Sequence, residues 1–390
     1  MTTPARRPAP GWRQEPHRLL FPLGALLGLL AVLPFALRGA GGGSLALFHS
    51  AAQLQGFLTC FALGFLFTFL PRRTGTDPPA GWVVLACAAL AAGSAACAWF
   101  HAALASYLCW LALATLALAF TLRRMVGRAR AGLPPAFAWL PVSLAAGLCG
   151  ALLAALAPLL GSASAPGAWV VGRGLLTQGL LAGLVVGVGG VLLPVITRGE
   201  VQAAGERGGA QHRALGHLAA AVLFQASFAL EPWAGEQAGF GLRAAVAAAA
   251  LVLSAGIHRW PALPGLHRRL VWLGAWMVPA GFALGALSPR LHGAALHVLF
   301  VGGYAQLALA LAVPVVLGGS PRAAALAGSP PALRATALLL AGAFAARVAA
   351  ALDLTRVAAW LAVAGAAFAG ALAAWTALVL PSLSGSPPAR

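Results

Sequence analysis

The sequence predicts an all-α, polytopic integral membrane protein with about twelve transmembrane helices. Hydrophobic residues make up 61% of its 390 residues, against roughly 45–50% in a typical globular protein. Charged residues make up 8%, against about 25% on average, which is too few to cover the surface of a soluble protein. Long apolar runs alternate with short polar connectors along the whole chain. This composition excludes a soluble enzyme, a disordered protein and a secreted disulfide scaffold.

Each predicted element is an apolar run long enough to cross a bilayer, which takes about 20 largely apolar residues in a helix. Twelve runs qualify, namely residues 19–37, 45–70, 81–99, 102–122, 136–159, 168–196, 214–231, 240–258, 269–287, 290–317, 333–352 and 357–380. Tight hairpins are expected near Phe100, Ser288 and Asp353, and longer connectors carry Pro, Gly and Arg. We therefore expect one transmembrane domain over residues 1–390, with residues 1–18 and 382–390 as short cytoplasmic tails.

The charge distribution indicates how this domain lies in the membrane. The chain has 25 basic and seven acidic residues, for a net charge of +18. Such a balance can indicate nucleic-acid binding, but the arginines lie in short clusters between apolar runs, so we expect a lipid bilayer and no nucleic acid as partner. Cytoplasmic loops of membrane proteins are enriched in basic residues. We therefore expect the protein in the bacterial inner membrane with both termini in the cytoplasm. In this orientation only Arg38, Arg290 and Arg356 lie in connectors on the outer side.

Several ionisable side chains lie inside the predicted spans, where they are costly and often functional. They are His49, Arg173, Arg243, His292, His297 and Arg347. In the orientation above all six lie near the outer ends of their spans, with His297 roughly 10 Å below the outer face at about 1.5 Å per residue. The sequence therefore predicts a cluster of histidine and arginine in the outer leaflet.

Two interpretations of this cluster compete. Arginines near helix ends can extend to the membrane interface, a simple account of Arg173 and Arg243 taken singly. Alternatively the cluster holds a cofactor, because histidine is a common ligand of haem iron and of copper, and arginine pairs with carboxylates such as haem propionates. His49, His297 and His292 are the candidate metal ligands. His292 and His297 are five residues apart, about 140° around a helix, so they are poorly placed to share one metal.

The other polar features of the chain suggest structural roles. The remaining histidines lie at span ends or in loops, where we expect them to be solvated: His17, His101, His212, His217, His258 and His267. Gly179, Gly183 and Gly187 form a small-residue face that favours close helix packing, within the chain or in an oligomer. No nucleotide-binding loop, hydrolase motif or zinc-protease motif is present, and no motif assigns a catalytic reaction.

At the level of its motifs the chain resembles the NnrS family of membrane proteins, which are described as binding haem and copper and are linked to nitric oxide metabolism. The likeness rests on E-P-H-R-L-L-F-P-L-G at residues 15–24, L-F-H-S-A-A-Q-L-Q-G-F-L at 47–58, G-F-L-F-T-F-L-P-R-R-T-G-T at 64–76, G-R-G-L-L-T-Q-G at 172–179 with G-V-G-G-V-L-L-P at 187–194, L-H-V-L-F-V-G-G at 296–303 and A-A-R-V-A-A at 345–350. The order and spacing of these pieces carry the resemblance.

The resemblance implies a haem site with His49 and His297 as ligands and Arg347 as a supporting cation, and a role in nitric oxide handling or the response to nitrosative stress. Many family members carry a second histidine and an acid where this chain has Ala51 and Ala52. Many also carry an arginine and a Gly-His pair where Pro314 and Gly319 stand. A ligand set thinned in this way can keep haem and lose copper, or bind neither.

Two other classes of protein stay open. A small-molecule transporter or permease would be favoured by inverted repeats of spans, of which the sequence shows no clear instance, and the absence of an acid in any span core argues against proton coupling. A non-catalytic subunit of a respiratory complex could use the glycine face to assemble.

Overall fold

A computed structural model describes residues 11–38, 43–126, 132–160, 165–201 and 207–383 of the chain. Those residues contain twelve helices long and apolar enough to span a membrane, and no β-strand. This confirms the predicted all-α membrane fold, and the observed spans start and end within a few residues of the predicted ones. Of the two expected tails, residues 1–10 and 384–390 lie outside the described part. The remainder of the first tail contains the short helix α1 (Gly11–Gln14), and α16 continues to Leu383.

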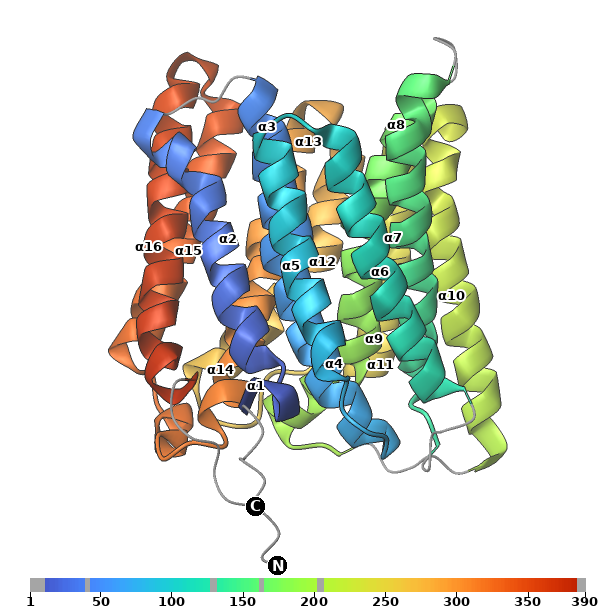
Figure 1. Ribbon diagram of the computed structural model, residues 1–390, viewed down its shortest axis with the longest axis vertical. Coiled ribbons are helices and arrows are strands. Elements are labelled where there is room, and N and C mark those ends of the chain that lie inside the picture. The colour runs from blue at the N-terminus through green and yellow to red at the C-terminus, as the bar shows by residue number, and fades with distance from the viewer. Residues whose placement is uncertain (1–10, 39–42, 127–131, 161–164, 202–206, 384–390) are drawn as a thin grey trace, which may run out of the picture.

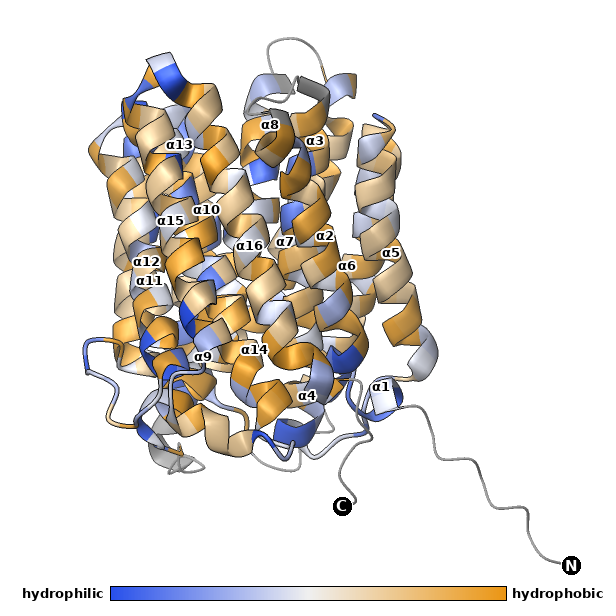
Figure 2. Cartoon of the chain, turned by 90° about the vertical axis from the view of Figure 1, so that its left-hand side faces the viewer, coloured by the Kyte–Doolittle hydropathy of each residue, from blue (hydrophilic) through white to orange (hydrophobic). Residues whose placement is uncertain are grey.

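Nine spans are each built on a single α-helix. They are α2 (His17–Arg38), α5 (Gly81–Trp99), α6 (Ala103–Met125), α7 (Trp139–Leu156, flanked by the 3₁₀ turns η2, Pro135–Ala138, and η3, Ala157–Leu159), α10 (Arg207–Ala234), α11 (Glu236–Ala255), α12 (Leu266–Leu287), α15 (Pro331–Leu352) and α16 (Val357–Leu383). The helices run side by side along one direction, and the first span packs against the last, so the bundle closes on itself (Figure 1). Apolar residues cover the middle of the bundle, and most hydrophilic residues gather towards its two ends (Figure 2).

The second, sixth and tenth spans form the centre of the bundle and are built differently. The second span consists of α3 (Gly43–Ser50), η1 (Ala51–Leu58) and α4 (Thr59–Thr74). The sixth span consists of α8 (Ala165–Gly174), η4 (Leu175–Gly179) and α9 (Leu180–Arg198). The tenth span follows the 3₁₀ turn η5 (Pro289–Leu291) and consists of α13 (His292–His297), η6 (Val298–Ala305) and α14 (Gln306–Leu317). Between 67% and 83% of their apolar windows is buried, against 22–50% in the other nine spans. The central spans are therefore enclosed by protein, and the other nine face lipid.

Each central span contains a π-helical segment, η1, η4 or η6, and each carries a proline nearer its other end, at Pro71, Pro194 or Pro314. A π-helical turn inserts an extra residue into the helix and is found frequently at functional sites. The three spans run in the same direction and are separated by three outer spans each. The three central spans are thus placed in parallel and do not form an inverted repeat, but parallel repeats also occur in transporters, so the placement does not exclude that class.

Glycines end two of the central spans at the side where the chain begins. Gly75 has φ 64° and ψ 31°, and Gly199 has φ 74° and ψ 10°. Both lie in the left-handed region, where a residue with a Cβ is strained and glycine is not. The sequence therefore stops these spans at defined positions, just beyond their terminal arginines.

The predicted glycine face is packed against helices of the same chain. Gly183 lies against the side chains of Ser143 and Trp139 on α7, and Gly187 lies against Leu140 on the same helix. Close approach of backbones is what small residues permit in membrane helices. Gly179 lies against Gln225 and Phe228 on α10, so the structure assigns this face to the packing of the sixth span on α7 and α10.

A close backbone contact with α7 sets the position of α8 just before the η4 segment. A Cβ added at Gly172 on α8 would lie 2.8 Å from the backbone N of Ala154 and 2.8 Å from the carbonyl O of Gly150, both on α7. Neither backbone atom can rotate away as a side-chain end can. Gly172 therefore holds α8 against α7 and fixes the height of the adjacent Arg173.

We predict that Gly172→Ala destabilises the protein by about 1–3 kcal/mol, the usual cost of overpacking a well-packed contact. The matched control is Gly167→Ala on the same helix, where nothing lies within 4 Å of the added Cβ. A glycine in a helix interior costs roughly 0.5–1 kcal/mol relative to alanine, so the control variant should be as stable as the unaltered protein or slightly more so. Denaturant unfolding in detergent measures both, and equal stabilities of the two variants would contradict this assignment.

Candidate functional site

Four of the six predicted site residues line one cavity. The cavity has a volume of about 400 Å³ and lies among the first, second, sixth, tenth, eleventh and twelfth spans. Its wall includes His49, Arg173, His297 and Arg347, all near the ends of the central spans opposite the chain termini or close to the exit of α15. A volume of this size falls within the usual range for small-molecule and cofactor sites, roughly 300–1,000 Å³. We call it the polar cavity.

His49 reaches the polar cavity from the last turn of α3. Its Nδ1 lies 3.1 Å from the carbonyl O of Ala31 on α2, and its ring meets the ring of Phe35 edge-on at 4.9 Å between centroids. The neighbouring Gln53 donates from Nε2 to the carbonyl O of Gly28, also on α2, at 3.0 Å. These contacts fix the imidazole against the first span.

His297 reaches the cavity from the last turn of α13. Its Nδ1 lies 2.7 Å from the carbonyl O of Gly293 and 3.3 Å from Nη2 of Arg347. A ring nitrogen that carries a proton can donate to a carbonyl, but it then has no lone pair with which to accept from a guanidinium. The shorter contact prevails, so Nδ1 of His297 carries the proton and Arg347 rests beside the ring without accepting or donating there.

The two histidines therefore share one arrangement. In each, the carbonyl contact assigns the proton to Nδ1 and leaves a lone pair on Nε2. Among the described residues neither Nε2 has a hydrogen-bond partner. Histidines that bind metals through one ring nitrogen almost always donate from the other to a carbonyl or carboxylate. Both side chains thus present the arrangement of an oriented metal ligand.

The polar cavity carries two positive charges and no negative one. Arg173 and Arg347 lie in its wall, and no described aspartate or glutamate does. Nε of Arg347 is buried without a hydrogen-bond partner in the described part of the chain, and the guanidinium of Arg173 lies over the ring of Trp169 at 4.7 Å. An unpaired charge away from water is costly. The arrangement therefore favours an anionic group in the cavity, and carboxylates pair with arginine best.

The remainder of the wall is mostly apolar and aromatic. Phe57, Phe300 and Phe368 contribute rings from the second, tenth and twelfth spans. The π-helical segments η1 and η6 begin within one turn of His49 and His297 and supply several of these wall residues. A flat apolar molecule with acidic substituents matches this combination of aromatic wall and arginine.

Arg243, the fifth predicted cofactor-binding residue, lies outside the wall of the polar cavity. Its side chain is fully buried and pairs with Glu231 near the end of α10. It also donates from Nε to the carbonyl O of Gly239 at 3.0 Å and from Nη1 to Oε1 of Gln178 at 3.2 Å. The rings of Phe228 and Phe240 lie over its guanidinium at 4.2 and 4.3 Å. Arg243 is thus satisfied by the protein itself.

His292, the third predicted metal ligand, also lies elsewhere. Its Nδ1 contacts the carboxylate of Glu236 at the start of α11. Both residues line a second space of about 610 Å³, which also borders Glu231 and Gln178. Arg173 lies in the walls of both spaces, together with Leu54, Leu296 and Phe300.

Two histidines that we expected to be solvated are buried. His17 is 4% exposed, with Nδ1 3.4 Å from Oγ1 of Thr68, and His267 is 1% exposed. Both lie at the start of a long helix whose first turn packs under a neighbouring span, which the sequence pattern does not reveal. No described group of three or more His, Cys, Asp or Glu side chains is placed to hold a metal ion.

The fold and the polar cavity together define a polytopic membrane protein with a buried histidine- and arginine-lined cavity. The chain matches the family described as NnrS protein over residues 11–386, nearly its full length. It therefore belongs to the NnrS family, as its motifs suggest. No curated protein matches it.

We predict that Glu231→Gln destabilises the protein by about 3–5 kcal/mol, because it leaves the buried Arg243 charge uncompensated. The control is Arg259→Gln, which removes an arginine that is 52% exposed and paired with the 41% exposed Glu200. Exposed pairs contribute about 0–1 kcal/mol. Unfolding in detergent compares the two, and a Glu231→Gln cost no larger than the control would contradict the buried pair.

Proposed function

We propose that this chain is a membrane haem protein with His49 and His297 as the iron ligands in the polar cavity. The observation that carries the proposal is the pair of imidazoles in one cavity, each with Nδ1 held by a backbone carbonyl and Nε2 free. The unpaired charges of Arg347 and Arg173 support it, since they would neutralise two propionates. Family membership adds to the case, because the resemblance to NnrS proteins implies haem.

The residues present fit haem better than a copper ion. The polar cavity offers two imidazoles, an aromatic wall and two arginines, which suit a flat macrocycle with two carboxylates. Copper bound by histidine and cysteine commonly uses three or more ligands, and Ala51 stands where the family often has a second histidine. We therefore propose haem as the cofactor. When bound by two histidines, haem would supply a centre for one-electron transfer.

The chain's own residues would perform the remaining tasks. Ala31 and Gly293 hold the imidazole tautomers through their carbonyls, and the aromatic wall excludes water. Arg173 lines both the polar cavity and the second space, where its charge would hold a carboxylate. We propose that the physiological role is nitric oxide handling or protection against nitrosative stress.

We predict that His49→Ala or His297→Ala lowers the haem content of the purified protein by at least tenfold, since each removes a coordinate bond. Arg347→Ala should reduce haem retention less, because it removes a charge partner and leaves both ligands. The pyridine haemochrome assay measures haem per protein.

His212→Ala is the control, since His212 is an exposed residue of α10. Its haem content should equal that of the unaltered protein. Full haem in both ligand variants would contradict the proposed site. A colourless unaltered protein that carries an organic anion across vesicles would support the transporter class instead.

We also propose that the protein lies in the bacterial inner membrane with both termini in the cytoplasm. The support is the excess of arginine at the ends of the spans where the chain begins and ends. The first span begins and the last span ends at the same side of the bundle (Figure 1). This orientation places the polar cavity in the outer leaflet.

We predict that alkaline phosphatase fused to the C-terminus is inactive, because the enzyme needs the oxidising outer compartment to form its disulfides. A fluorescent protein fused at the same position should fluoresce. The control fusion follows Phe100, in a hairpin expected on the outer side, and should give active phosphatase. The reverse pattern would place the polar cavity in the inner leaflet.

A further inference from the structure

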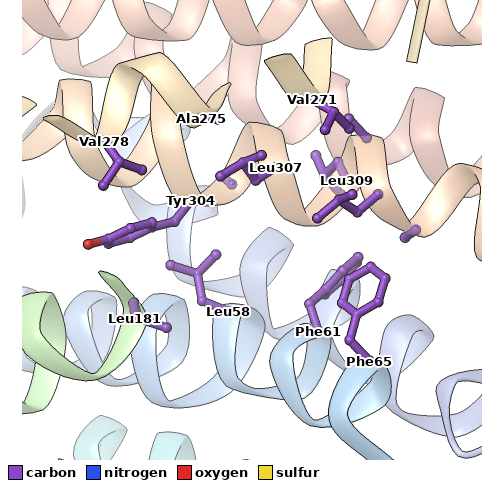
Figure 3. Close-up of a cluster of buried hydrophobic side chains, with 14 of the residues drawn as sticks. Leu58, Phe61, Phe65, Leu181, Val271, Ala275, Val278, Tyr304, Leu307 and Leu309 are labelled. Atoms are coloured by element: carbon purple, nitrogen blue, oxygen red, sulfur yellow. The ribbon is translucent and has the colours of Figure 1, made fainter. Parts of the chain in front are cut away.

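A second, smaller cavity lies at the centre of the bundle, farther along the central spans from the polar cavity. Its volume is about 80 Å³, and its wall comes entirely from the second, sixth and tenth spans. Leu58 and Phe61 face it from the second span, Leu181 from the sixth, and Tyr304 and Leu307 from the tenth. Figure 3 shows these side chains converging from the facing helices. We call this space the apolar cavity.

In the described part of the chain, the wall of the apolar cavity offers water at most one side-chain partner, the hydroxyl oxygen of Tyr304 as an acceptor. Every lining residue is apolar except Tyr304. The Tyr304 hydroxyl donates to the carbonyl O of Gln178 at 3.3 Å, so its hydrogen is already engaged. A buried water needs two to four polar partners, and cavities without them stay dry. Charged or strongly polar ligands are disfavoured for the same reason.

The size of the apolar cavity restricts what it can hold. A dry cavity of about 150 Å³ in another protein binds benzene or xenon. A space of about 80 Å³ is too small for most organic ligands, and it suits a single xenon atom or a diatomic molecule. Small uncharged molecules of low polarity are therefore the class that fits.

The apolar and polar cavities share a wall. Leu58 lines both, and it lies in η1, the π-helical segment that follows His49. On the tenth span, Ala305 lines the polar cavity and Ala308 lines the apolar one, one helical turn farther. Leu58 is 5% exposed and belongs to the buried core, so its side chain forms part of the packed wall between the two spaces.

We propose that the apolar cavity is a binding site for a small uncharged molecule of low polarity, no larger than a xenon atom or a diatomic gas, next to the polar cavity. Gas binding depends on the apolar wall and on the scarcity of polar groups in it, and it does not require haem. Its use as a reservoir that exchanges with the polar cavity past Leu58 rests on the proposed haem function.

Diffraction from crystals of the full-length protein under xenon pressure tests the site. We expect one anomalous peak between Leu58, Leu181 and Ala308. Ala308→Phe should abolish the peak by filling the cavity, whereas Ala89→Phe, at an exposed position of α5, should leave it intact. Ala308→Leu, a smaller change, replaces the phenylalanine variant if the latter fails to fold, and should also remove the peak.

An unaltered protein without xenon at this position, or with ordered water there, would overturn the proposal. A peak that persists in the folded Ala308 variants would overturn it as well. The experiment separates this proposal from the haem proposal, because xenon should still bind to His49→Ala protein that lacks haem. Xenon binding in a protein that never contains haem would support the gas site and contradict only its role as a reservoir for haem.

Discussion

Inside a bilayer a polar group must find its partner within the protein, and this constraint explains the arrangement of the whole interior. Arg243 meets it with Glu231, Gln178 and a carbonyl, so it is a closed structural element. Arg347 and Arg173 do not meet it with any described carboxylate, although both face a cavity. The difference separates an arginine that stabilises the fold from two whose charges no described carboxylate neutralises. The same reasoning makes the small cavity beside Leu58 a site for uncharged molecules only.

The central spans satisfy this constraint and position the side chains of the candidate site. The second, sixth and tenth spans are shielded from lipid by the other nine, so they can carry polar side chains away from the hydrocarbon. Each passes into a π-helical segment just after His49, Arg173 or His297. The extra residue of a π-helical turn rotates the following side chains relative to an α-helix. The carbonyls of Ala31 and Gly293 then fix the histidine rings. Positioning of the predicted ligands thus depends on helix geometry and on the neighbouring backbone.

The sequence carries enough information for the spans and for four site residues, because both depend on local patterns. Apolar runs define the helices, and the rarity of charge inside them marks His49, Arg173, His297 and Arg347 as unusual. The partner of Arg243 was not predictable, since Glu231 lies at the end of another span and meets Arg243 only through the packing of α10 on α11. The prediction that His17 and His267 are solvated was wrong for the same reason, because their burial also depends on tertiary packing. The π-helical segments have no composition signal, so the regular placement of the three central spans emerges only in three dimensions.

The central claim is that two imidazoles of this chain bind one haem. Electron paramagnetic resonance of the purified, oxidised protein, recorded together with its visible spectrum, tests that claim most directly. The account predicts a Soret band and a low-spin ferric signal typical of two axial histidines, at about one haem per chain. A protein that contains no haem, or only high-spin haem with a single histidine ligand, would contradict it.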